Sequence, residues 1–84
     1  MATTTSFTLS GDEYTEVVAG TSNDFLLQNL GWVKCEVVWA ASLPADSASG
    51  HILLYGGAVV RNGLTGKVYA KAMNGSSVVM VTEE

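Results

Sequence analysis

Apolar and polar residues alternate in short runs along this chain, which is the pattern that half-buried β-strands produce. The clearest runs, 67–73 and 77–82, flank Asn74-Gly75, a pair suited to the tight turn of a β-hairpin. We therefore predict a hairpin here, and its inward residues are Val68, Ala70, Val79 and Val81. A lone hairpin is only marginally stable in water, so the rest of the chain must supply more strands.

The same alternation between glycine-rich and polar turns predicts further strands at 6–10, 13–19, 25–30, 32–40, 51–55 and 58–61. The run 25–30 has apolar residues on both faces, as in a strand covered twice. Seven or eight short strands at this spacing predict an all-β fold, a compact antiparallel β-sandwich of Greek-key or jelly-roll type. A small β-barrel is the alternative. The loop 41–50 is expected to cross between the two sheets, and a helical turn can begin in it at Pro44.

Length allows a single domain, 1–84, preceded by an extended N-terminal arm over about residues 1–6. This threonine-rich arm is either a frayed end or a segment that adds to the sheet edge of a neighbour. The composition is 48% hydrophobic and 14% charged. Because a chain this short has little interior, so apolar a composition favours self-association or docking on a larger body.

The net charge is −4, and the four basic residues form no cluster. Nucleic-acid binding and attachment to an anionic membrane both need such a cluster, so we expect neither. The first residues lack the basic start and apolar stretch of a secretory signal. No run is long enough for a membrane helix. We therefore expect a soluble product made in a cytoplasm.

Groups for catalysis are sparse. Cys35 alternates with valines and a tryptophan, as a buried thiol does, and His51 has no partners for a zinc site. The acids fall in turns and on polar strand faces. Asp46, Ser47 and Ser49 precede His51 in one short loop, which is poor support for a catalytic triad. No glycine run has the Lys-Ser/Thr ending of a phosphate loop. We expect no enzyme activity, no metal and no cofactor.

The aromatic residues divide into two groups. Phe7, Phe25 and Trp39 fall on apolar faces and are expected in the core. Outward-facing tyrosine and tryptophan are enriched at interfaces. The candidate interface residues are therefore Trp32, Tyr55 and Tyr69, together with Thr3, Thr4 and Thr5 of the arm.

Several short motifs resemble the small β-rich virion proteins of tailed bacteriophages. They are Ser6-Phe7-Thr8-Leu9, Tyr14-Thr15-Glu16-Val17-Val18-Ala19-Gly20, Leu27-Gln28-Asn29, Leu43-Pro44-Ala45-Asp46, Gly50-His51, Gly66-Lys67-Val68-Tyr69-Ala70 and Val79-Met80-Val81-Thr82. Each motif is short, but together they span nearly the whole chain.

The resemblance implies a non-enzymatic structural protein of the virion, assembled in the host cytoplasm: a capsid decoration (cement) protein on the capsid surface, a head-fibre base or a tail-associated component. A capsid decoration protein that bridges neighbouring shell subunits is the first hypothesis, and it implies the major capsid protein or another virion protein as partner. Such proteins are often homo-oligomers, trimers or dimers. A carbohydrate- or receptor-binding module of a tail or head fibre is the alternative. The resemblance supplies no catalytic residues.

Overall fold

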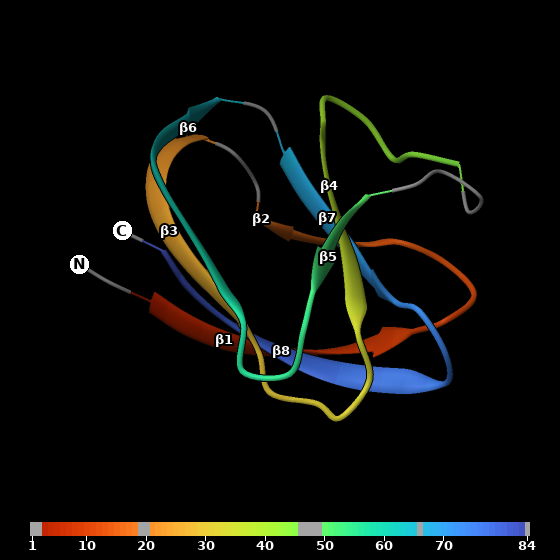
Figure 1. Cartoon of the computed structure of the whole chain (residues 1–84). Coiled ribbons are helices and arrows are strands. Elements are labelled where there is room, and N and C mark those ends of the chain that lie inside the picture. The colour runs from red at the N-terminus through yellow and green to blue at the C-terminus, as the bar shows by residue number, and fades with distance from the viewer. Residues whose placement is uncertain (1–2, 19–20, 46–49, 66, 84) are drawn as a thin grey trace.

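A computed structural model describes the backbone of residues 3–18, 21–45, 50–65 and 67–83, and their side chains except those of 3, 21–23 and 61–65. The described chain is all-β (Figure 1). Its strands are β1 (Thr3–Ser10), β2 (Thr15–Val18), β3 (Thr21–Asn29), β4 (Cys35–Ala40), β5 (His51–Leu53), β6 (Ala58–Thr65), β7 (Lys67–Ala72) and β8 (Ser76–Glu83). Among the described residues, no helix has the length and apolarity that crossing a membrane requires.

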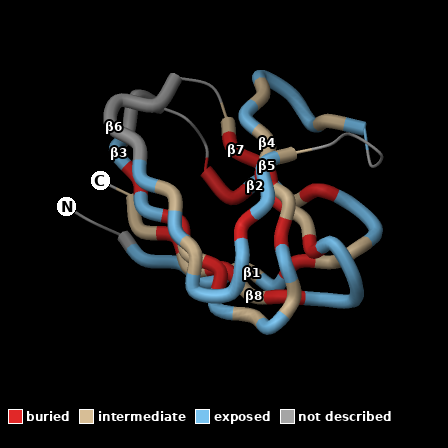
Figure 2. Tube along the Cα trace, in the orientation of Figure 1, coloured by how far each residue is buried: buried red, intermediate tan, exposed pale blue. Residues whose placement is uncertain are grey.

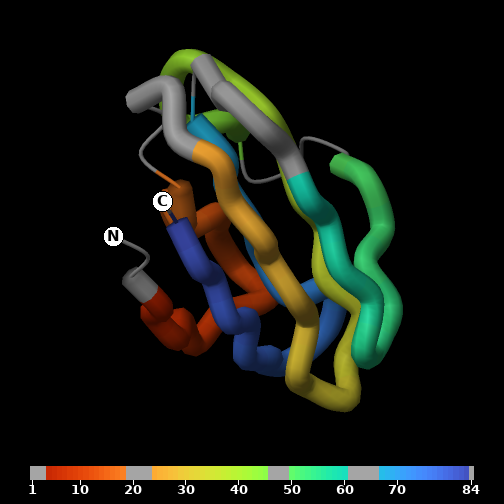
Figure 3. Tube along the Cα trace, turned by 90° about the vertical axis from the view of Figure 1, so that its left-hand side faces the viewer, coloured from red at the N-terminus to blue at the C-terminus, as the bar shows by residue number. Residues whose placement is uncertain are grey.

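The strands form two antiparallel four-stranded sheets. Sheet A has the order β1-β8-β3-β6 and sheet B the order β2-β7-β4-β5. Figure 3 shows the strands of sheet A side by side as one layer, with the start of β1 beside the end of β8, where Thr3 pairs with Glu83. The chain passes repeatedly from one sheet to the other, which is jelly-roll connectivity, so the predicted antiparallel sandwich is confirmed.

The expected hairpin at Asn74-Gly75 is wrong. Strand β7 pairs with β2 and β4 in sheet B, whereas β8 pairs with β1 and β3 in sheet A. Gly75 does adopt a positive φ of 72°, but the turn carries the chain across the sandwich. The inward residues were predicted correctly, because the period-two alternation fixes which face is buried whatever strand lies alongside.

Two predicted connections also differ. Loop 41–50 joins β4 and β5, which are neighbours in sheet B, so it does not cross between sheets. Pro44 and Ala45, where the expected helical turn would begin, are not helical, and residues 46–49 lie outside the described residues. From Thr3 onward the expected N-terminal arm is strand β1, paired with β8 of the same chain. Residues 1–2 lie outside the described part.

The core lies between the sheets and is built from the inward residue of each alternating pair (Figure 2). Leu9, Leu27, Cys35, Val79 and Ala70 are completely buried there. The two sheets contact each other most extensively through β1, β2, β7 and β8. The prediction that β3 is covered on both faces is wrong, since its outward Leu26 is 43% exposed. Sheet A therefore has one uncovered outer face.

Candidate functional site

A buried asparagine joins the two sheets at one end of the sandwich. Asn29 follows Phe25 and Leu27 on the inward face of β3, and it is fully buried. Its side-chain Nδ2 donates to the carbonyl oxygens of Val33, at 2.9 Å, and Leu53, at 3.1 Å. Its Oδ1 accepts from the backbone N–H of Gly31, at 3.0 Å, and from the Ser77 hydroxyl, at 2.9 Å. A buried amide with all its hydrogen bonds made rigidifies the elements that it connects.

Backbone hydrogen bonds hold loops 30–34 and 54–57 side by side at this end of the sandwich. The N–H of Asn29 donates to the carbonyl of Gly57 at 3.0 Å, and the N–H of Gly56 returns to the carbonyl of Asn29 at 2.8 Å. Gly56 has a positive φ of 77°, which glycine adopts without strain. A Cβ on Gly31 would overlap the Ser77 side chain, so the loop closes tightly on β8. Loops 30–34 and 54–57 are thus fixed relative to each other.

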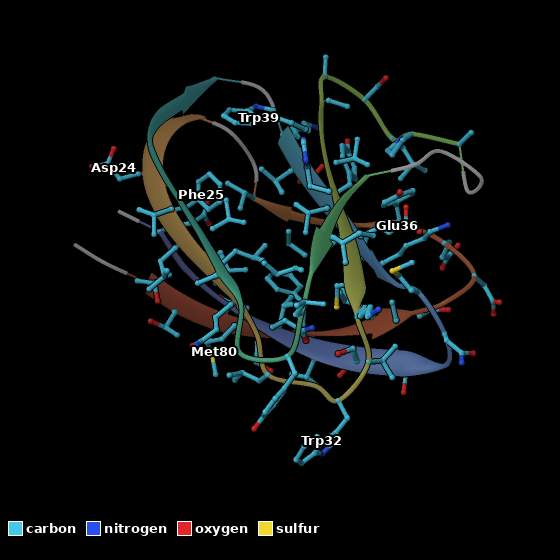
Figure 4. The ribbon with its side chains drawn as sticks, viewed as in Figure 1. Asp24, Phe25, Trp32, Glu36, Trp39 and Met80 are labelled. Carbon is cyan, nitrogen blue, oxygen red and sulfur yellow. The ribbon has the colours of Figure 1, made fainter. Side chains whose placement is uncertain are left out.

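The two loops present a stacked pair of aromatic rings to solvent. The Trp32 and Tyr55 ring centroids are 4.6 Å apart, with 17° between the ring planes. Trp32 is 86% exposed and Tyr55 57% exposed. Trp32 points away from the body of the domain (Figure 4). We call Trp32 and Tyr55 the aromatic platform; its order comes from the loops beneath it and from ring stacking.

The predicted interface residues lie in three different parts of the structure. Trp32 and Tyr55 come together in the platform, although Trp32 lies in the loop before β4 and does not open a strand as predicted. Thr4 and Thr5 are exposed on β1, and the side chain of Thr3 lies outside the described residues. Tyr69 is only 4% exposed, so its selection as an outward contact is wrong. Its side chain is on the outer face of sheet B, where Glu16 and Val38 lie opposite it in register.

A second feature is a cavity of about 280 Å³ on the β5–β6 side. Val37, Trp39 and His51 line it from sheet B, and Val59 lines it from sheet A. Trp39 was expected in the core, yet it is 48% exposed, at the open end of the sandwich (Figure 4). Alternation correctly gave its inward direction. What sequence reasoning missed is that the sheets do not close over it.

The surroundings of the Cys35 thiol make it unreactive. Burial raises the pKa of the Cys35 thiol above its usual 9.0, although a hydrogen bond with Ser77 acts in the opposite direction. A thiol of raised pKa stays protonated near neutral pH and is a poor nucleophile. Among the described residues, no three His, Cys, Asp or Glu side chains are grouped to hold a metal ion.

Sequence reasoning also missed the role of Asn29, which it placed in the predicted strand 25–30 without assigning it a function. The available signal was an amide at an inward position, directly after Phe25 and Leu27. A polar residue in register with a core face needs internal partners, and such partners fix local structure. The alternation in β3 therefore indicated a buried polar residue, and this residue supports the aromatic platform.

No protein-family model and no curated protein sequence match this chain. Solved structures do share its fold. A de novo designed double-stranded β-helix is 16% identical with a TM-score of 0.71, over 98% of this chain and 99% of the design. A sugar phosphate isomerase of the cupin superfamily from Silicibacter pomeroyi is 9% identical, with a TM-score of 0.69 over 98% of this chain and 49% of the isomerase.

A transcriptional regulator of the HTH_3 family from Vibrio cholerae is 11% identical, with a TM-score of 0.69 over 98% of this chain and 42% of the regulator. The chain thus spans about half the length of the isomerase and somewhat less of the regulator. These similarities establish the double-stranded β-helix, or jelly-roll, fold. Fold and function are separable, and the matched proteins include an enzyme, a regulator and a design.

Proposed function

We propose that this chain is a non-enzymatic structural protein of a bacteriophage virion, a capsid decoration protein that docks on the outer shell and stabilises it. The aromatic platform is the observation that carries the proposal. A tryptophan that is 86% exposed, yet held by a stacked partner, is an unfavourable surface for an isolated domain. The virion partner is supported by the sequence motifs that resemble small phage structural proteins.

The platform has the chemistry of a docking anchor. Interface energy is concentrated in a few aromatic side chains that enter pockets on the partner. Because the loops are already ordered by Asn29 and the Gly56 and Gly57 hydrogen bonds, little conformational entropy is lost on docking. The same loops expose Leu30, at 42%, and Leu54, at 56%, which adds apolar area around the rings.

Binding to stripped capsids tests the proposal. Heads of the encoding phage, purified without this chain, are mixed with the purified protein, and the bound copies are measured by co-sedimentation. We expect saturable binding and greater resistance of the heads to heat. Trp32→Ala should weaken binding by about 30-fold or more, as loss of an interface hot spot does. Leu43→Ala is the matched control, since Leu43 is 62% exposed on the loop after β4.

Two results would refute this proposal: no binding to heads at tens of micromolar, or equal binding by Trp32→Ala and the unmodified chain. Circular dichroism of each variant shows whether the fold is retained. The Trp32 side chain is so exposed that its removal should leave the fold intact.

The exposed ring of Trp32 also favours a second candidate function, carbohydrate binding in a tail or head fibre. The apolar C–H face of a sugar stacks on such a ring, and the side chain of Gln28 lies near the same loops, where its Nε2 donates to the carbonyl of Gly56 at 3.4 Å. A saccharide array distinguishes the two functions. Array binding that Trp32→Ala abolishes, with no binding to stripped heads, would favour the fibre module.

A further inference from the structure

The cavity between the two sheets, on the β5–β6 side, is a feature that the aromatic platform does not use. In sheet B, Trp39 pairs with Val68 and Val37 pairs with His51, and register partners share a face of the sheet. These four side chains therefore form one wall of the cavity. Val59 of β6, which packs against the core, forms the opposite wall. We call this space, of about 280 Å³, the β5–β6 cavity.

The β5–β6 cavity opens to solvent at the edge of sheet B. A second, more open hollow at this edge shares Val37, Trp39 and His51 with the cavity and is also lined by Gly50. Trp39 is 48% exposed although its register with Val68 turns it inward, and His51 is exposed as well. Trp39 and His51 therefore stand at the mouth, between the cavity and solvent.

The walls indicate the chemistry of a ligand. Val37, Val59 and Val68 make the interior apolar, and the Trp39 indole supplies a flat aromatic surface. Among the described residues that line the cavity, His51 has the only titratable side chain, and a neutral imidazole donates one hydrogen bond and accepts another. Ligand sites typically combine an apolar lining with a few polar groups that orient the ligand. The matching ligand is apolar, with one hydrogen-bonding group at the His51 end.

The volume limits the ligand to one or two rings. A dry apolar cavity of about 150 Å³ accepts benzene. The β5–β6 cavity, at about 280 Å³, is nearly twice that size and matches two fused rings. A planar aromatic ring gains more than an aliphatic one here, because it can stack on Trp39. A sugar fits poorly, since most of its hydroxyl groups would be buried against valines without hydrogen-bond partners.

We propose that the β5–β6 cavity binds a small planar aromatic compound of one or two rings that carries a single hydroxyl or N–H group. The rings lie against Trp39, and the polar group meets the His51 imidazole at the mouth. The inference goes beyond the proposed function and does not depend on what the aromatic platform binds. Trp39 and Trp32 lie at opposite ends of the domain (Figure 4), so the two sites are separate.

Titration of the ¹⁵N-labelled chain with 2-naphthol, followed by NMR, tests the proposal. This probe has two fused rings and one hydroxyl. The two tryptophans give two indole N–H signals, which Trp32→Phe assigns. We expect the Trp39 signal and the Val37 and Val59 amide signals to shift saturably, with a dissociation constant on the order of 100 μM. The Trp32 signal should stay in place.

Two neighbouring positions on β6 give a matched pair of variants. Val59→Phe adds a ring inside the cavity and should weaken 2-naphthol binding by at least 10-fold. Val60→Phe adds the same ring at a position that is 63% exposed on the outer face, so it should leave the affinity unchanged. The spread of the amide signals shows that each variant is folded. His51→Ala, at an exposed position, should weaken binding by about 10-fold through loss of one hydrogen bond.

Three results would overturn the proposal. They are the absence of a saturable Trp39 shift at 1 mM 2-naphthol, shifts confined to Trp32, and equal affinity of Val59→Phe and Val60→Phe. If Val59→Phe does not fold, His51→Ala decides, and an unchanged affinity would then refute the site. These titrations use no phage heads, so the cavity and the proposed docking function fail independently.

Discussion

The outer faces of the two sheets follow the same alternation but differ in how they meet solvent. On sheet B, Lys67 and Glu16 form an ion pair at 3.2 Å, and the Lys71 ammonium lies 5.0 Å from the centre of the Tyr14 ring. Tyr69 lies opposite Glu16 in register and is 4% exposed. On the outer face of sheet A, Leu26 is 43% exposed and Val60 63% exposed, and the residues in register with them, Thr82 and Thr4, are uncharged. Long charged side chains can cover an apolar surface within one chain, whereas short hydroxyl side chains leave it open to a partner.

The largest loss of stability is expected on replacing Asn29, the residue that joins the two sheets. Asn29→Ala removes an amide that makes four hydrogen bonds to loop 30–34, β5 and β8, and the Leu53 carbonyl and the Gly31 N–H lose this side-chain partner. The Ser77 hydroxyl keeps its hydrogen bond to the Val33 carbonyl, at 3.3 Å. We expect the free energy of unfolding to fall by about 4 kcal/mol, since each unsatisfied buried group costs about 1–3 kcal/mol. Urea denaturation followed by circular dichroism measures this loss.

The control for Asn29→Ala is Asn74→Ala, which changes an exposed asparagine in the β7–β8 turn. If Asn29→Ala cost less than about 1 kcal/mol, the sheets would be joined by packing alone. The variant should also lose the fixed geometry of the Trp32–Tyr55 pair, which the near-ultraviolet circular dichroism of the stacked rings reports.

The second-largest loss of stability is expected at Tyr69, and a substitution on the outer face of sheet A serves as the comparison. Tyr69→Ala should lower the free energy of unfolding by about 3 kcal/mol, because it removes a large buried side chain. Leu26→Ala, on the outer face of sheet A, should cost less than about 1 kcal/mol, because Leu26 is 43% exposed. Both are measured by urea denaturation. Equal losses would show that the two faces are covered alike.

Sequence reasoning succeeded where the decision is local. Alternation placed every strand approximately and gave the buried face of β7 and β8 correctly, because a strand's side-chain period does not depend on its neighbours. It failed on pairing. Asn74-Gly75 reads as a hairpin turn, but β1 and β3 flank β8 in the other sheet. Nothing local to the turn distinguishes a hairpin from a crossing between sheets.

The predicted site residues Tyr69 and Trp32 also show that local sequence does not predict which residues come together in the fold. Tyr69 stands between two lysines, which indicates an exposed face, yet neighbours from β2 and β4 bury it. Trp32 was chosen as an exposed aromatic and is 86% exposed, but its stacking on Tyr55 joins residues that are distant in sequence. The identity of exposed aromatics was accessible from sequence; their grouping required the tertiary structure.

A smaller loss of stability is expected at alkaline pH, where Tyr14, next to strand β2 of sheet B, titrates. Burial, followed by the nearby Glu36 carboxylate, raises the pKa of Tyr14 above its usual 10.0. The folded chain therefore holds this proton more tightly than the unfolded chain. The resulting stabilisation is complete below the unfolded pKa and is lost as pH rises through the folded pKa. The free energy of unfolding should fall as pH is raised from 9 to 11.

Tyr14→Phe tests this assignment, because phenylalanine keeps the ring and removes the titrating hydroxyl. The variant should lose less stability over the same pH range than the unmodified chain. Cys35, whose pKa burial also raises, contributes to the remaining slope. An identical pH dependence in the two chains would contradict the role of Tyr14.

The smallest effect is expected for the ion pair that distinguishes sheet B from sheet A. The Glu16 and Lys67 side chains are each more than 40% exposed, so solvent screens their attraction. A double-mutant cycle with Glu16→Gln and Lys67→Met should give a coupling energy of about 0.5 kcal/mol, falling further in 1 M salt. A coupling above about 1 kcal/mol that persists in salt would mean that the pair acts by holding side chains over Tyr69. The covered face of sheet B would then depend on charge pairing as well as on side-chain length.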